Sequence, residues 1–211
     1  MFFGGIFDSL DHGWASLMHG MQNGFFNTFF KYFSYLADKG VIILIAAIVL
    51  MLFKKTRMRG AVIFLAVAAA IILGYAAKFV IARPRPFFDQ ASDYYLWWQA
   101  AGADSSSSYS CPSGHASIAF AFATAFIMTF DKRYGWTGIV FALIICVART
   151  YLMKHYLSDV LFGMVFGLVS GVCAYYITQL IFDALNKHCD NKFCNFLLEA
   201  DITQAFEKKE K

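Results

Sequence analysis

Charged residues are scarce in this chain. Only 15% of its 211 residues are charged and 59% are hydrophobic, whereas an ordinary soluble domain is about one quarter charged and about half apolar. This composition excludes a soluble globular domain and indicates an integral membrane protein. Cysteines are also few. The five are an odd number and two of them lie inside apolar runs, so they form no disulfide framework.

The positive charge of the chain does not have the pattern of a nucleic-acid-binding protein. The formal net charge is +4, and the basic residues lie in short clusters beside apolar runs. A nucleic-acid-binding protein gathers such residues in a stripe or on one face. Membrane topology accounts for these clusters better, and we expect no nucleic-acid partner.

Apolar runs predict an all-α fold, a polytopic bundle of about five transmembrane helices. The runs are 41–53, 61–82, 115–130, 136–151 and 160–182. The first is short for a bilayer that needs about 20 residues, so its helix is either tilted or includes residues before Gly40. Residues 1–37 carry apolar and polar residues at helical spacing, which predicts amphipathic helices lying in the interface. Residues 184–211 are predicted to form a cytoplasmic tail.

The basic clusters predict the orientation of the bundle. Residues 54–59, the pair Lys132 and Arg133, and the C-terminal tail share one side if there are five spans. The positive-inside rule makes that side cytoplasmic. The opposite, extracytoplasmic side of the plasma membrane then receives the unusual polar residues, which are Lys78, Arg83, Arg85, His115, Arg149, His155 and Asp159.

Several of these residues are suited to binding a phosphate. Lys78, Arg85 and Arg149 offer a point charge and two planar donor forks, which match the nonbridging oxygens of a phosphate. Ser113 and Gly114 stand where an apolar helix begins. Ser113 can cap that helix or bind phosphate, and the backbone N–H of Gly114 can donate to an anion.

Two histidines complete the components for phosphoryl transfer. Asp159 follows His155 by four residues, so on a helical turn its carboxylate can orient that imidazole, which favours His155 as the nucleophile. His115 is then the acid that protonates the leaving oxygen. This chemistry requires no metal and no cofactor. Arg83 either assists phosphate binding or meets lipid head groups.

The order and spacing of these residues resemble the three-part signature of the type 2 phosphatidic acid phosphatase (PAP2) superfamily. The signature residues here are Lys78, then Arg85 and Pro86, then Pro112, Ser113, Gly114 and His115, and finally Arg149, His155 and Asp159. Three motifs in the same order make a specific match. Ala148 and Cys111 depart from the family pattern, in which a serine and an aromatic residue are frequent.

The resemblance covers about residues 38–183 and implies a PAP2/haloperoxidase-like helical core that forms the catalytic domain. It also implies a phosphohistidine intermediate on His155 and a lipid phosphate or diphosphate as substrate. Undecaprenyl diphosphate is the first candidate, with phosphatidylglycerophosphate and phosphatidic acid behind it. A lipid phosphotransferase, which passes the phosphoryl group to another lipid, is an alternative enzyme, and a transporter is a remote non-enzymatic one.

A stripe of small residues on the last span has two possible functions. Gly163, Gly167 and Gly171 recur every four residues. This spacing favours close helix packing inside one chain, and it also leaves a homodimer possible.

Overall fold

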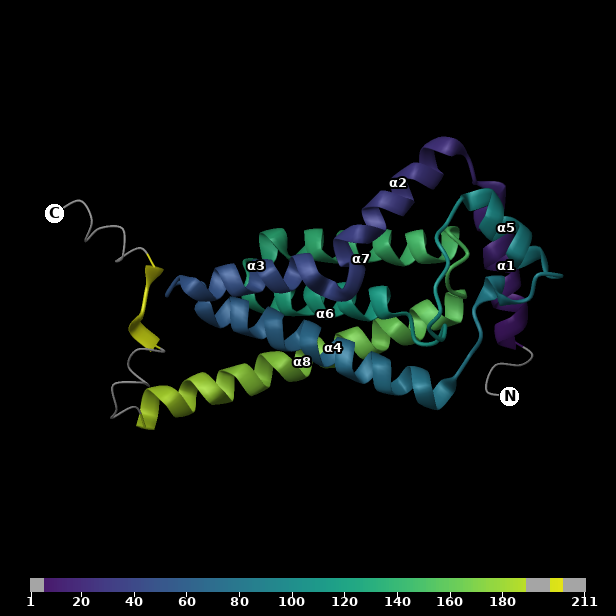
Figure 1. Ribbon diagram of the computed structural model, residues 1–211. Coiled ribbons are helices and arrows are strands. Elements are labelled where there is room, and N and C mark those ends of the chain that lie inside the picture. The colour runs from purple at the N-terminus through teal and green to yellow at the C-terminus, as the bar shows by residue number, and fades with distance from the viewer. Residues whose placement is uncertain (1–5, 189–197, 203–211) are drawn as a thin grey trace.

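A computed structural model describes residues 6–188 and 198–202, and its regular elements are helices throughout this part of the chain (Figure 1). The elements are α1 (Ile6–Gly20), α2 (Gly24–Ser34), η1 (Tyr35–Gly40), α3 (Val41–Leu52), α4 (Arg57–Ile81), η2 (Pro86–Phe88), α5 (Asp93–Ala101), α6 (Gly114–Thr129), α7 (Lys132–Tyr151) and α8 (Leu157–His188). The all-α prediction is confirmed. The tail predicted at 184–211 lies largely outside the described residues.

Four stretches are long and apolar enough to cross a membrane. They are Gly24–Leu52, Arg57–Ile81, Lys132–Tyr151 and Leu157–Lys187. The third predicted span, 115–130, corresponds to α6, which has only 16 residues and a length of about 24 Å. The first span does include residues before Gly40, because α2, η1 and α3 form one 29-residue stretch.

This first span bends between α2 and α3. Lys39 and Gly40 have φ values of 49° and 69°, in the left-handed region, which interrupts the helical hydrogen bonding. A Cβ atom at Gly40 would lie 2.9 Å from Cγ1 of Val67, so glycine allows both the backbone conformation and the close contact with α4. The bend places Asp38 and Lys39 beside the polar end of α6.

The centre of the bundle is α6, which packs against α4, α7 and α8. Its alanines at 116, 119, 121, 123 and 125 are at most 2% exposed, and such small side chains let neighbouring helices approach closely. The glycine stripe of α8 faces it. A Cβ atom at Gly167 would lie 2.4 Å from the backbone oxygen of Ser117, and one at Gly163 would lie 2.6 Å from that of Ser113. The prediction of close packing inside one chain is confirmed.

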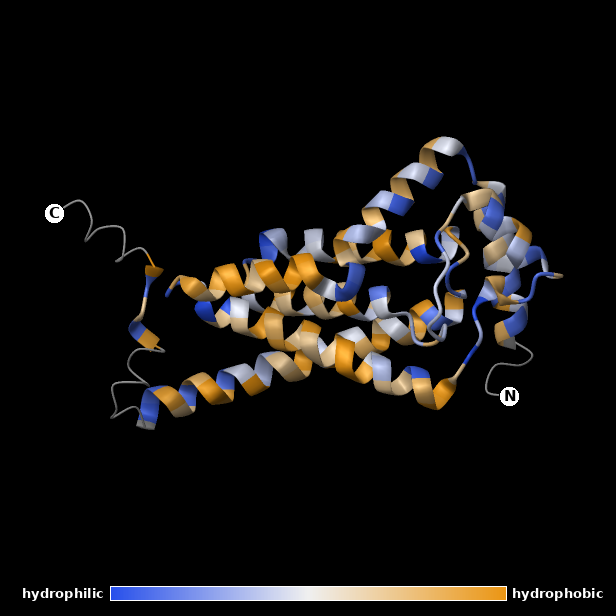
Figure 2. Cartoon of the chain, in the orientation of Figure 1, coloured by the Kyte–Doolittle hydropathy of each residue, from blue (hydrophilic) through white to orange (hydrophobic). Residues whose placement is uncertain are grey.

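The two ends of the bundle differ. Figure 1 shows α1 and α5 lying across one end, where Ala15 and Met18 of α1 pack on Tyr151 and Leu152. The α3–α4 connection, the α6–α7 connection and the end of α8 lie at the other end, which therefore holds the basic cluster of residues 54–59 and the pair Lys132 and Arg133. There Lys54 pairs with Glu199. Figure 2 shows apolar residues along the bundle between these ends.

Candidate active site

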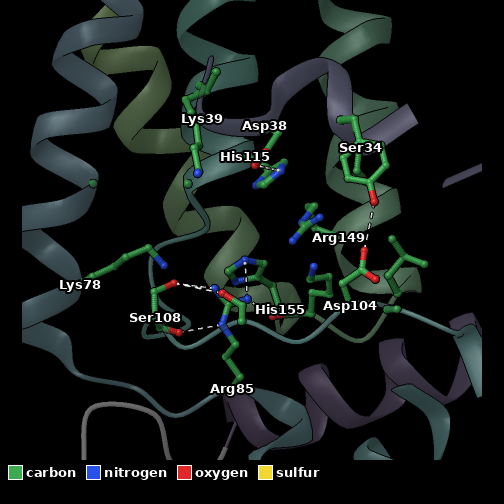
Figure 3. A pocket seen from close by; sticks show the side chains of 18 of the residues that line it. Ser34, Asp38, Lys39, Lys78, Arg85, Asp104, Ser108, His115, Arg149 and His155 are labelled. Atoms are coloured by element: carbon green, nitrogen blue, oxygen red, sulfur yellow. Dashed lines mark hydrogen bonds and ion pairs between the residues drawn. The ribbon is translucent and has the colours of Figure 1, made fainter. Parts of the chain in front are cut away.

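A cavity of about 550 Å³ is lined by residues of α2, η1, α4, α6 and α7 and of the connections after α4, α5 and α7. Six of the predicted site residues line it, namely Lys78, Arg85, Gly114, His115, Arg149 and His155. They come from α4, the loop after it, α6, α7 and the turn before α8, and Figure 3 shows most of them converging. Ser113 and Asp159 lie behind this lining and are fully buried.

The three predicted phosphate-binding cations are almost completely buried. Lys78 and Arg85 are 7% exposed and Arg149 is 4% exposed. The Lys78 ammonium donates to the backbone oxygens of Tyr109 and Ser110, and Nε of Arg149 has no hydrogen-bond partner in the described structure. Like charges held this close in a desolvated cavity repel one another, and an anion would relieve that repulsion.

Arg85 connects the phosphate-binding residues to His155. Its Nε donates to the backbone oxygen of Ser108 at 2.7 Å, and one terminal nitrogen donates to the Lys154 oxygen at 2.8 Å. The same nitrogen lies 3.3 Å from Nε2 of His155. The pKa of Arg85 is lowered to about 10 by burial. The Arg85 guanidinium therefore lies directly beside Nε2 of His155.

His155 is held from its other side by a serine that the sequence did not single out. Its Nδ1 lies 3.8 Å from Oδ2 of Asp159, so the four-residue spacing brings the two together, yet the separation exceeds hydrogen-bond length. The hydroxyl of Ser110 lies 3.4 Å from the same Nδ1 and donates to Asp159 at 2.5 Å. Burial, followed by the charges of Arg85 and Arg149, holds the pKa of His155 well below its usual value. The imidazole is therefore neutral at neutral pH.

The Arg83 side chain does not line the cavity, and only 10% of it is exposed. One of its terminal nitrogens donates to Asp159 at 2.7 Å and the other to Asp11 at 2.9 Å, and its guanidinium lies 3.9 Å from the ring centroid of Tyr156. Arg83 therefore has a structural role, in place of the phosphate binding or head-group contact that the sequence suggested. Arg83 holds the carboxylate of Asp159 in place.

Asp11 was also missed by sequence reasoning. Apolar residues surround it at helical spacing, a pattern that predicts only a polar position on an interfacial helix, as for Asp8. In the structure it is 1% exposed, and it accepts hydrogen bonds from the backbone N–H and the hydroxyl of Ser158 at 2.8 and 2.7 Å. No local signal separates Asp11 from Asp8, because the partners of Asp11 lie more than 70 residues away in the sequence.

His115 and Ser113 lie at the start of α6, but only His115 lines the cavity. His115 lines the cavity, and its Nε2 lies 3.7 Å from Oδ1 of Asp38 at the bend of the first span. Ser113 stands at the start of α6 without a side-chain cap, and its buried Oγ has no partner in the described structure. Its backbone N–H donates to the backbone oxygen of Asp159 at 3.0 Å. The turn is thereby tied to the start of α8.

This combination of fold and site defines a class of membrane protein. A membrane-spanning helical bundle encloses two histidines and three buried cations in one cavity, and such a set of residues is suited to phosphate chemistry. Residues 59–183 match the PAP2 superfamily, and the chain belongs to this superfamily. Asp11 and Asp38 lie before the matched region.

Individual relatives agree with this membership. The chain is 33% identical over 118 residues to an undecaprenyl-diphosphatase of Sulfolobus acidocaldarius, which covers 56% of this chain and 54% of that protein. It is 37% identical over 82 residues to a lipid A 1-phosphatase of Porphyromonas gingivalis, which covers 37% of this chain and 18% of that protein. The chain thus spans about half the length of the first relative and less of the second.

A solved structure shares the fold. The crystal structure of a transmembrane PAP2 type phosphatidylglycerolphosphate phosphatase from Bacillus subtilis matches with a TM-score of 0.65 and 21% sequence identity, over 82% of this chain and 87% of that one. The PAP2-like helical core implied by the sequence is therefore confirmed.

Proposed function

We propose that the protein is a membrane lipid phosphatase that hydrolyses a lipid diphosphate or phosphomonoester, with undecaprenyl diphosphate as its foremost substrate. The observation that carries this proposal is the cavity itself. Two histidines and three buried cations form the polar part of its lining, and Ala70, Ile71 and Ile118 of α4 and α6 add an apolar part. Such a cavity suits a phosphate on an apolar chain. Family membership and the names of the relatives support the same substrate class.

The first step of the proposed reaction transfers the phosphoryl group to the protein. Nε2 of neutral His155 attacks the terminal phosphorus, and the bond from that phosphorus to the leaving oxygen breaks. His115, when protonated, gives its proton to this oxygen. Lys78, Arg85 and Arg149 stabilise the charge on the phosphoryl oxygens, which is the main task of a protein in phosphoryl transfer.

The second step regenerates His155. His115, now neutral, takes a proton from water as the water oxygen attacks the phosphorus, and the bond between phosphorus and Nε2 breaks. Ser110 and Asp159 stabilise the positive imidazole of the intermediate from its Nδ1 side. Inorganic phosphate is released, and the lipid alcohol or lipid phosphate has already departed.

Phosphate release from a panel of lipids tests the proposal. Purified protein would be given undecaprenyl diphosphate, phosphatidylglycerophosphate and phosphatidic acid, with and without a metal chelator. We expect His155→Ala to lower turnover by about three orders of magnitude or more, and the chelator to have no effect. As a matched control, His12→Ala removes an exposed histidine of α1 that does not line the cavity, and it should change turnover by about twofold or less.

Each outcome of this assay has a meaning. Full activity in His155→Ala would contradict the assignment of His155 as the nucleophile. Loss of turnover with chelator would contradict a metal-free reaction. A phosphorylated acceptor lipid in place of free phosphate would identify a phosphotransferase.

The proposal includes a location for the site, on the extracytoplasmic face of the plasma membrane. The support is the concentration of basic connections at the opposite end of the bundle. Single cysteines at Ser105 and at Lys55, each in a cysteine-free background, would be labelled from outside intact cells. We expect labelling at 105 and protection at 55, and the reverse result would invert the topology.

A further inference from the structure

Lys154 lies in the turn between α7 and α8, at a position between Arg149 and His155 that the third motif does not specify. Its backbone is anchored on both sides, because its N–H donates to the Arg149 oxygen at 3.1 Å and its own oxygen accepts from Arg85 at 2.8 Å. Met153 before it has a φ of 51°, in the left-handed region. This anchored turn directs the half-buried side chain of Lys154 into the wall of the cavity.

The Lys154 ammonium has no counterion in direct contact. Within residues 6–188 and 198–202, no carboxylate lies within the 4.0 Å of an ion pair with it. The carboxylate of Asp104 acts on it from a distance but is already occupied, by Lys31 at 3.0 Å and by the hydroxyl of Tyr35 at 3.1 Å. Burial, followed by the charges of Arg149 and Arg85, lowers the pKa of Lys154 to about 8.

The charge of the whole lining exceeds what one phosphate would neutralise. Four basic side chains of the lining are buried or half-buried, Lys78, Arg85, Arg149 and Lys154, whereas its two acidic side chains, Asp38 and Asp104, are exposed. A phosphomonoester carries about −1.5 to −2 charges at neutral pH. A second phosphate group on the ligand would supply the missing negative charge.

Lys154 lines the cavity together with His115, although it is next to His155 in the sequence. Its charge is among the strongest that act on His115. The strongest charges acting on His155 come instead from Arg85, Arg149 and Lys78. In the proposed reaction the terminal phosphoryl group is bonded to His155 and the leaving group lies beside His115. Lys154 is therefore placed on the leaving-group side.

We propose that Lys154 binds the second phosphate of a lipid diphosphate, the one that departs with the lipid. This inference rests on the proposed function and specifies its substrate class. When the bond between the terminal phosphorus and the bridging oxygen breaks, the electron pair stays on that oxygen and His115 supplies its proton. The lipid monophosphate that leaves is an anion, and the Lys154 ammonium stabilises it. A phosphomonoester substrate has no group for this position.

The test compares turnover of a polyprenyl diphosphate by three purified variants. We expect Lys154→Met to lower kcat/KM by roughly 10- to 100-fold, the range for a hydrogen bond between charged groups, and Lys154→Arg to recover most of this loss because it keeps the charge. Lys39→Met is the matched control. Lys39 lines the same cavity and Figure 3 shows it reaching toward the site, but it is exposed, so its charge is screened by water and kcat/KM should fall by less than about threefold.

A second measurement isolates the subsite from the catalytic residues. Inorganic phosphate and pyrophosphate would be compared as competitive inhibitors of the same reaction. In Lys154→Met we expect the inhibition constant of pyrophosphate to rise roughly tenfold or more relative to that of phosphate. A misfolded or generally weakened site would affect both inhibitors alike.

The results separate the inference from the function on which it rests. If the wild-type protein cleaves the diphosphate but Lys154→Met leaves the ratio of the two inhibition constants unchanged, the Lys154 subsite is wrong and the proposed function stands. An equal loss in Lys39→Met would likewise replace the subsite with a general electrostatic effect. A wild-type protein that releases phosphate from no lipid would overturn both.

Discussion

Asp11 offers the sharpest test of how the site is held together. Its carboxylate is 1% exposed and accepts from Arg83 at 2.9 Å and twice from Ser158 at 2.8 and 2.7 Å. Asp11→Asn keeps an acceptor for Ser158 but places an N–H group, or at best a neutral oxygen, against the buried Arg83. Breaking a buried ion pair costs about 3–5 kcal/mol. Because Arg83 retains Asp159, we expect the lower part of that range, about 3 kcal/mol.

This loss would be measured as a fall in Tm of the purified protein in detergent, together with kcat and KM for phosphate release. At about 2–4 °C per kcal/mol for a chain of this size, the fall should be roughly 6–12 °C. We expect kcat to fall more than KM rises, since Asp159 loses its fixed position behind His155. Asp8→Asn is the matched control on the same helix, where the carboxylate is exposed. Equal Tm values for Asp11→Asn and Asp8→Asn would refute the reasoning.

Three further results are expected. Brief incubation of wild-type protein with a lipid phosphate labelled at its terminal phosphorus should give acid-labile labelled protein, and label retained in His155→Ala would place the intermediate elsewhere. Gly167→Ala should destabilise by about 1–3 kcal/mol, because the new Cβ would overlap backbone atoms of α6. Gly74→Ala, with nothing within 4 Å, should be neutral or stabilising, and similar Tm values for the two would contradict close packing of α6 and α8. Tm should also fall as the pH drops below about 6.5, because the unfolded chain binds a proton at His155 that the folded site resists. This fall should be smaller in His155→Ala, and an equal fall would assign it to other groups.

The part of the site that sequence reasoning found consists of residues whose chemistry is readable locally. Lys78, Arg85 and Arg149 stand at the ends of apolar runs, where cations are costly without an anion. His155 and Asp159 are four residues apart, and this spacing brings them to 3.8 Å although His155 lies in the turn before α8. All five lie at the cavity or directly behind it. The spans were predictable for the same reason, although α6 is shorter than a bilayer requires.

The sequence by itself determined that the chain is a helical membrane protein and predicted which residues carry phosphate chemistry, because composition, periodicity and short spacings are local properties. The tertiary structure decided the surroundings of those residues. Arg83 meets Asp11 across 72 positions of the chain, and Asp11 meets Ser158 across 147. The place of Lys154 in the cavity lining was decided in the same way. Such contacts depend on how α1 packs across the bundle and how the turn before α8 is anchored, and no spacing along the chain encodes either.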